Sequence, residues 1–183
     1  MQASDYTPNY FNVQNTVNWE PPSKTWVTAA LVDNPNFKSR HFRVVNGVLQ
    51  VQRVTGVFLL SANINFIRTN GAIIRIVIER DDGNEVKEII LDNFSTTAIS
   101  WSHGNDWTSA TSSITNLPIE VKFLDTIRLE CMVETNGNGG GCNVRHKEIG
   151  VANTTTNFGA VSLVLLHKTG DYQVTNTIKT LTN

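Results

Sequence analysis

The segment of the chain with the most capacity for chemistry is Trp101-Ser102-His103-Gly104-Asn105-Asp106-Trp107. Two indole rings flank an imidazole and a carboxylate within seven residues. Aromatic rings stack on sugar faces and neighbouring polar groups bind sugar hydroxyls, so Trp101, His103, Asp106 and Trp107 form a candidate glycan-binding loop. A structural interpretation stays open beside it, in which the tryptophans bury their large rings against the protein or in a subunit cleft.

Two cysteines, Cys131 and Cys142, lie almost symmetrically about the glycine-rich run 136–141. Opposed across a regular hairpin, they could approach the geometry of a disulfide. The alternative is a pair of reduced thiols, as is usual for proteins that remain in a cytosol. Two cysteines alone are too few ligands for a zinc site, so we expect no metal here.

The remaining chemically capable residues form no recognisable active site. The acidic turn 81–85 has carboxylates but lacks the spaced ligands of a calcium loop, and we interpret it as a solvated turn. His41, His103, His146 and His167 are scattered, and no spacing of Ser, His and Asp suggests a catalytic triad. No phosphate loop or zinc motif is present. The sequence therefore predicts a non-enzyme with no catalytic residues, no metal and no cofactor.

The composition excludes several classes of partner. The net charge of -1 gives no electrostatic footprint for nucleic acid, and no apolar run approaches the roughly 20 residues needed to insert into a membrane. The first residues lack the basic and apolar regions of a secretory signal, so we expect synthesis without export by that route. The 21 Asn and 21 Thr residues favour strands joined by many turns.

The strongest structural signal is the segment 56–67, around which we expect the core to form. Phe58, Leu60 and Phe66 fall on one face, while polar residues fill the other face of its second half. Side chains on a strand alternate between two faces, so this pattern predicts a strand with one face buried. Segments 73–78 and 160–166 are similarly apolar, and we expect both to pack in the same core.

Turn signals divide the rest of the chain into further short strands. Asn46-Gly47 between apolar runs predicts a two-residue hairpin loop, because both central residues need positive φ. The expected strands are 26–32, 42–45, 48–51, 72–80, 86–91, 119–123, 126–134, 142–149 and 160–167. The polar segment 92–116 is either functional or contains a further strand. About ten strands without a helix or repeat predict an all-β sandwich or barrel.

The N-terminal residues 1–22 are polar, without helical or strand periodicity. They contain scattered aromatic residues and end at a stiff Pro21-Pro22 pair, which we take as the boundary of a domain spanning 23–183. One interpretation is a flexible terminus. The other is a docking arm whose aromatic anchors bind a neighbouring protein. These anchors are Tyr6, Tyr10, Phe11 and Trp19.

Three segments resemble a known family. Residues 56–64 look like the G-V-Y-x-F-S-A-N-V strand of the complement C1q and tumour-necrosis-factor jelly-roll superfamily. Residues 124–129 resemble its G-D-x-V-x-L strand start, although Leu124 stands where the family usually has Gly. Residues 156–167 resemble the closing T-x-F-S-G-F-L-L strand, with Gly159 one position early. The order and spacing of the three segments match the family across about 42–167.

The resemblance implies a ten-stranded jelly-roll β-sandwich that assembles as a trimer without enzymatic activity. Phe58, Leu60, Phe66, Phe158, Val161, Leu163 and Leu165 are then expected at the core and trimer interface. The same fold occurs as decoration domains or knobs of bacteriophage particles, and this Asn/Thr-rich, cysteine-poor chain looks most like that branch. The resemblance thus implies a virion protein made in the host cytoplasm.

Three functions follow as hypotheses. The first is a homotrimeric capsid decoration or cement protein that docks on the major capsid protein or another virion protein. The second is a knob of a fibre or tail that binds a host surface glycan through the 101–107 loop. The third is a hydrolase built on a β-sandwich. We favour decoration over a fibre tip because the chain has no heptads or collagen repeat to form a stalk.

Overall fold

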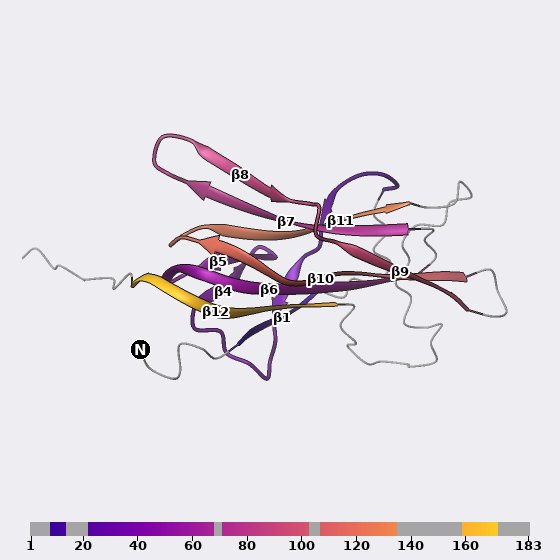
Figure 1. Cartoon of the computed structure of the whole chain (residues 1–183), viewed down its shortest axis with the longest axis horizontal. Helices are drawn as coiled ribbons and strands as arrows, with labels where there is room; N and C mark the ends of the chain where they lie inside the picture. Colours follow the sequence, from indigo (N-terminus) through magenta and orange to yellow (C-terminus); the bar gives the residue numbers. More distant parts are fainter. Residues whose placement is uncertain (1–7, 14–21, 68–70, 103–106, 135–158, 172–183) are drawn as a thin grey trace, which may run out of the picture.

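Every regular element in the described part of the chain is a β-strand (Figure 1). The computed structural model describes residues 8–13, 22–67, 71–102, 107–134 and 159–171. The strands are β1 (Asn9–Val13), β2 (Val27–Thr28), β3 (Leu31–Asp33), β4 (Phe42–Val45), β5 (Val48–Val51), β6 (Val54–Ile67), β7 (Gly71–Asp81), β8 (Val86–Leu91), β9 (Thr96–Ser102), β10 (Trp107–Val121), β11 (Thr126–Glu134) and β12 (Gly159–Asp171).

These strands form two antiparallel sheets that pack face to face. Sheet A has the order β3-β1-β12-β6-β10-β9, and sheet B has the order β4-β5-β11-β7-β8, with β2 pairing with β11 beside β5. Four antiparallel pairs are nested along the chain: β1 with β12, β5 with β11, β6 with β10 and β7 with β8. This nesting defines a jelly roll, so the predicted fold class is confirmed by the strand order itself.

Strand β6 lies at the centre of sheet A, between β12 and β10. Its even-numbered residues point into the sandwich, and Phe58, Leu60, Ile64 and Phe66 are fully buried. Phe42 contributes to the same core from sheet B, with its ring edge-on to Phe58 at 5.0 Å between centroids. The segment predicted to organise the chain is therefore a central strand of sheet A.

The predicted strand 26–32 is two strands in the structure, because the chain changes sheets within it. Residues of β2 pair with β11 in sheet B, whereas β3 pairs with β1 in sheet A. Between them, the Ala29 amide donates to the Leu129 carbonyl, and the Leu31 amide donates to the Gly47 carbonyl. The polar segment 92–116 contains β9 and most of β10, which settles the question left open by its sequence.

The prediction that residues 1–22 form an arm is wrong for Asn9–Val13. This segment is strand β1, which pairs with both β12 and β3. Phe11 and Val13 are each 1% exposed in the core. The physical reason is that a short strand with only two inward apolar residues shows too little periodicity to be recognised from sequence. Residues 1–7 and 14–21, with Tyr6 and Trp19, lie outside the described residues.

Candidate functional site

The outer face of sheet A carries almost no charge. Strand β6 has no charged residue along its whole length, and the outward residues of β1 and of β12 up to Leu166 are also uncharged. Glu120 is the one acidic residue of β10. Surface strands facing only water normally carry charged side chains, and depletion of charge is typical of the cores of protein interfaces. The outer face of sheet A is therefore the first candidate for a functional surface.

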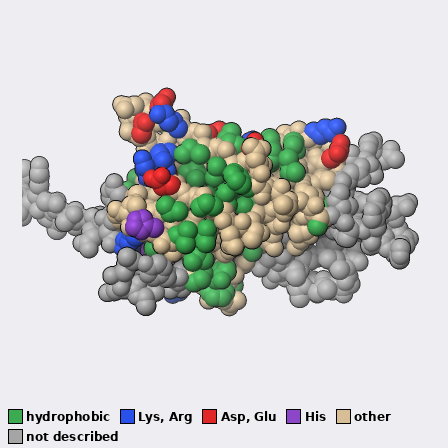
Figure 2. All heavy atoms as spheres, in the orientation of Figure 1, with side chains coloured by type: hydrophobic (Ala, Val, Ile, Leu, Met, Phe, Trp, Pro, Cys, Tyr) green, Lys and Arg blue, Asp and Glu red, His purple; other side chains and the backbone are tan. Residues whose placement is uncertain are grey.

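One half of this face is apolar. Leu59 lies between Pro118 of β10 and Val164 of β12 in the sheet register. Val57 and Leu166 extend the surface along the same strands, and Leu166 is 50% exposed. We call these five residues the apolar patch. Figure 2 shows one side of the molecule, where hydrophobic side chains gather in the middle and charged side chains lie toward the upper edge and the ends.

The other half of the face is a shallow polar hollow. A bulge in β10 between Ile114 and Leu117 interrupts its pairing with β6. At the bulge, Asn116 has a positive φ of 51° and its amide donates to the Ser61 hydroxyl at 2.9 Å. The hollow beside it has a volume of about 250 Å³. Side chains lining it include Tyr10, Ser61, Asn63, Ser113 and Ser162.

Tyr10 forms one wall of this hollow, and its ring packs against Phe37 with 4.7 Å between the centroids. Phe37 itself is 47% exposed. Predicted as an anchor of an arm, Tyr10 instead belongs to the outer face of sheet A. Phe11, the next predicted anchor, points the opposite way into the core.

The outer face of sheet B is, in contrast, a layer of paired charges. Arg128 of β11 bonds to Glu79 of the adjacent strand β7 at 2.8 Å and to Glu88 of β8, one strand further, at 2.5 Å. The hydrogen bond to Glu88, followed by that to Glu130, raises the pKa of the Arg128 guanidinium. Arg75 pairs with Glu130 at 2.7 Å. Because these charges satisfy one another, this face offers little to attract a charged ligand.

The same layer also covers apolar surface. Val77 points outward between Arg75 and Glu79 on β7, yet it is fully buried. The register places it beside Arg128 of β11 and Ile90 of β8. Arginine stems cover apolar neighbours while the guanidinium groups stay near water. The side chains of sheet B thus cover Val77, although Ile73 and Ile90 on the same outer face stay 37% and 44% exposed.

A buried ion pair fixes the turn between β10 and β11. The Asp125 carboxylate, 2% exposed, accepts from Arg80 at 2.7 Å and from the Lys122 amide at 2.7 Å. The hydrogen bond to Asp125 raises the pKa of Arg80. Leu124 in this turn has a φ of 70°, a backbone conformation that favours glycine. This is the position at which the sequence departs from the Gly of the resembling family.

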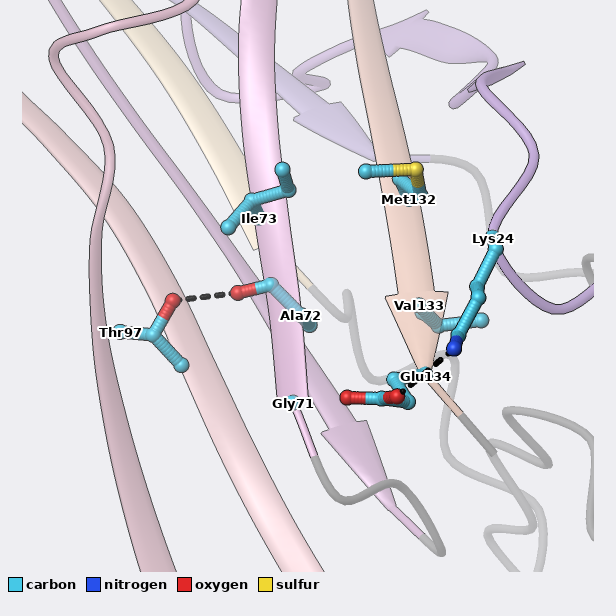
Figure 3. Close-up of a pocket in the computed structure, with 8 residues that line it drawn as sticks. All are labelled: Lys24, Gly71, Ala72, Ile73, Thr97, Met132, Val133 and Glu134. Carbon is cyan, nitrogen blue, oxygen red and sulfur yellow. Dashed lines mark hydrogen bonds and ion pairs between the residues drawn. The ribbon is translucent and has the colours of Figure 1, made fainter. Parts of the chain in front are cut away.

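A cleft of about 460 Å³ lies at the end of β7 and β11 (Figure 3). Ile73 and Met132 lie side by side on its floor, and the Thr97 hydroxyl from β9 donates to the Ala72 carbonyl. At its rim, Lys24 and Glu134 form an exposed ion pair at 3.2 Å. The described lining holds no paired nucleophile and base, so we assign no reaction to this cleft.

The described residues predicted at the core and trimer interface belong to the core of a single chain. Phe58, Leu60, Phe66, Val161, Leu163 and Leu165 are all at most 2% exposed between the two sheets. A contact between subunits would have to use residues that alternate with them, such as Leu59 and Val164. The sequence signal for these was the lack of charge on β6 and on β12 up to Leu166. Phe158 lies outside the described residues.

The predicted glycan-binding loop lies at the hairpin between β9 and β10. Trp101 and Trp107 are residues of these strands, and the backbone of Trp107 pairs with Ser102. Their side chains, and the whole of residues 103–106, lie outside what the structure describes. The glycan hypothesis therefore stays a prediction.

Cys131 and His41 both lie in the interior of the protein. Cys131 lies within the core, and burial raises the pKa of its thiol to about 12. Cys142 lies outside the described residues, so the pairing of the two is not decided. His41 is buried with its ring edge-on to Phe58 at 5.9 Å between centroids. No group of three or more His, Cys, Asp or Glu among the described residues is arranged to hold a metal ion.

Comparisons with known proteins find distant likenesses among solved structures. No protein-family profile matches the chain, and no curated protein matches it. Among solved structures, it is similar to murine APRIL at pH 8.0, with 11% identity, a TM-score of 0.45, and coverage of 87% of this chain and 100% of that one. It is also similar to Eiger TNF from S. frugiperda, with 13% identity, a TM-score of 0.45, and coverage of 87% and 91%.

These likenesses are too distant to say anything about ligands or assembly, and the jelly roll is established by the strand pairing described above. In the part of the chain that the structure describes, no helical segment has the length and hydropathy to cross a membrane.

Proposed function

We propose that this protein is a non-enzymatic structural protein that assembles as a homotrimer through the outer face of sheet A. The observation that carries the proposal is the contrast between the two outer faces. The middle of sheet B is covered by paired Arg and Glu side chains. Sheet A presents the apolar patch, and Glu120 beside Val57 is the one acidic residue of β6 and β10. A second copy that covered this patch would remove apolar surface from water.

The number of three subunits rests on the sequence resemblance to the C1q and tumour-necrosis-factor superfamily. So does the wider role that we propose, a decoration or cement protein on the head of a bacteriophage, located in the virion and docked on its major capsid protein or another virion protein. The protein would stabilise the particle mechanically, through the surface that is buried between its subunits, and would catalyse no reaction. Recognition of a host glycan is the alternative role, for which the hairpin between β9 and β10 is the candidate site.

The assembly is tested by changing one residue of the apolar patch. Leu59 is half-buried on the outer face, so Leu59→Asp should leave the chain folded but place a charge in the subunit contact. Sedimentation or mass photometry should give three times the chain mass of 20.3 kDa for the natural protein. We expect the Leu59→Asp variant to sediment as a monomer with unchanged far-ultraviolet circular dichroism.

The matched control is Val86→Asp, because Val86 is 60% exposed on β8 of the other sheet. It introduces the same charge at an apolar surface residue outside the proposed contact and should leave the trimer intact. A natural protein that is monomeric at micromolar concentration would overturn the proposal. So would a Leu59→Asp variant that still assembles.

The virion role is tested separately, by locating the protein on an assembled particle with electron microscopy. Density for a trimer on the capsid surface would support decoration. Density only at the tip of a tail or fibre would favour the glycan-binding alternative.

A further inference from the structure

The four edge strands of the sandwich differ in how they are protected against pairing with another chain. In sheet B, β4 carries Arg43, and β8 carries Lys87 and Glu88. In sheet A, β3 is three residues long and ends at Asp33. Short length and charged side chains are the usual means by which natural proteins block edge-to-edge association.

Strand β9 has none of these protections. Its sequence, Thr-Thr-Ala-Ile-Ser-Trp-Ser, contains no charge, no proline and no glycine. It pairs with β10 on one side, from Thr96 opposite Ser113 to Ser102 opposite Trp107, and sheet A ends with it among the described strands. Thr96 and Ala98 are exposed. The outer edge of β9 therefore presents a row of backbone donors and acceptors to a further strand.

The chain itself contains a segment suited to that edge, residues 172–183. Seven of its twelve residues are β-branched or aromatic, the types favoured in strands, and Lys179 is its single charge. Tyr172, Val174 and Ile178 fall on one face at the spacing of a strand with one buried side. Residues 1–7 are a poorer match, because they include Asp5 and only two residues of strand-favouring type.

Within one chain, residues 172–183 would have too few residues left to pair along β9 after covering the distance from β12. Strand β12 ends at Asp171, opposite Val54, whereas β9 begins level with Asn63 through Ser113. Nine residues along β6 span about 30 Å, and the position beyond β9 is four strand spacings, or about 19 Å, from β12. The segment would use about ten residues merely to cover this distance. Figure 1 shows the end of β12 and strand β9 toward opposite ends of the molecule.

We propose that residues 172–183 of one copy add as a strand to the outer edge of β9 in another copy. Backbone hydrogen bonds would supply the affinity, and alternate side chains would set the register. The contact is distinct from the apolar patch, because it uses a sheet edge and a terminal segment rather than a sheet face. Each chain donates one strand and accepts one, so the contact can close a ring or link neighbouring assemblies.

A labelled peptide of residues 172–183 tests this contact directly on the full-length protein. The protein should carry Thr177→Pro, because proline removes a backbone donor and prevents its own segment from competing for β9. Fluorescence anisotropy should then show saturable binding of one peptide per chain. A peptide that itself carries Thr177→Pro should not bind. Absence of saturable binding by the natural peptide would overturn the proposal.

The acceptor is tested by placing a charge on the edge of β9. Ala98→Lys, or Thr96→Lys as a second variant, should weaken peptide binding by about tenfold or more, because a lysine on an edge strand opposes strand addition. Val86→Lys on the edge strand β8 is the matched control and should leave binding unchanged. Equal binding by the Ala98→Lys protein would place the peptide elsewhere and refute the contact.

A third outcome is also informative. If Ala98→Lys lowers the mass of the assembly while the peptide fails to bind, β9 pairs with β9 of a second copy and the proposed donor is wrong. Peptide binding does not depend on the subunit contact at the apolar patch. Failure of this experiment would therefore leave the trimer proposal standing, and failure of the Leu59→Asp experiment would leave this contact standing.

Discussion

Removing the Asp125 carboxylate should destabilise the fold more than removing any charge on its surface. The side chain of Asp125 is 2% exposed and that of Arg80 is 17% exposed, so neither charge can be fully hydrated once its partner is lost. The two groups make three hydrogen bonds, at 2.7, 3.1 and 3.2 Å, and Asp125 also accepts from the Lys122 amide. Breaking a buried pair by removing one partner costs about 3–5 kcal/mol.

We therefore expect Asp125→Ala and Arg80→Ala each to lower the free energy of unfolding by about 3–5 kcal/mol. For a chain of this size, that corresponds to a fall in Tm of about 10 °C. The double variant should cost about 2–3 kcal/mol less than the sum of the two, because each single change leaves the same partner uncompensated. Equilibrium urea denaturation of the four proteins measures all three quantities.

The control is Lys87, which pairs with Asp82 and Glu85 at the surface, with side chains 57%, 40% and 62% exposed. Lys87→Ala should have no measurable effect, because water replaces the lost partners. Strictly additive effects of Asp125→Ala and Arg80→Ala would refute the coupling inferred from the hydrogen bonds. A loss of less than about 1 kcal/mol in Asp125→Ala would show that the pair is not a buried one.

Three further predictions concern single residues. Urea denaturation should show Leu124→Gly to be more stable than Leu124→Ala by about 0.5 kcal/mol, because a left-handed backbone disfavours any residue with a Cβ. At most positions alanine is the more stable of the two. A more stable Leu124→Ala variant would contradict the φ of 70°. Burial raises the pKa of the Cys131 thiol from 9.0 to about 12, so at high pH the folded state holds a proton that the unfolded state loses. The contribution of the Cys131 thiol to the free energy of unfolding should be constant below about pH 9 and should fall by up to about 1.4 kcal/mol per pH unit above it. Cys131→Ala should remove this part of the dependence of stability on pH. We expect Trp107 to be buried, so Trp107→Ala should lower the free energy of unfolding by about 3 kcal/mol. Iodide should then quench the tryptophan fluorescence of the natural protein only weakly. Strong quenching, with a spectral shift on adding host polysaccharide, would instead support the glycan-binding loop.

The fold could be predicted from sequence where turn chemistry marks the ends of strands. Strands β4, β5, β8 and β11 have the predicted boundaries because Asn46-Gly47, the acidic turn 81–85 and the residues before Thr126 interrupt apolar runs. The Asn46-Gly47 prediction is confirmed by positive φ angles of 51° and 81°. Local backbone requirements of this kind depend on neighbouring residues alone, so they can be recognised without knowing the tertiary structure.

Strand β9 and the first part of β10 escaped prediction, whereas the end of β10 was predicted as the strand 119–123. In the first part of β10, the core-facing residues Ala110 and Ser112 are small. Ser112 of β10 is fully buried, and its hydroxyl lies 2.7 Å from that of Ser95. A buried serine satisfied by another serine has no signature in a hydrophobic pattern. Pro118 also argues against a strand, since proline cannot donate to a ladder. It is tolerated because β9 pairs with β10 only as far as Ser113, leaving one side of β10 open at Pro118.

The candidate surface on sheet A was missed for a different reason: its mark in the sequence is a lack of charged residues. A search for reactive or aromatic residues finds Trp101 and Trp107, but it passes over fourteen consecutive residues of β6 without a charge. Once the sheet register is known, the same scarcity of charge separates the two outer faces: paired charges on sheet B, and Glu120 as the one charge on β6 and β10 of sheet A. The faces could have been compared from sequence only if the strand order had been known.

The two proposed contacts of sheet A rest on different forces, and they should respond to different conditions. The apolar patch gains free energy from burying side chains, which weakens on cooling because apolar hydration has a large heat-capacity change. Strand addition at β9 depends on backbone hydrogen bonds. These do not bury apolar surface, so this heat-capacity effect does not weaken them on cooling. Cooling should therefore weaken the subunit contact at Leu59 more than peptide binding at Ala98. If both contacts weakened in parallel, the edge of β9 would owe its affinity to side-chain burial, and the strand-addition geometry would lose its support.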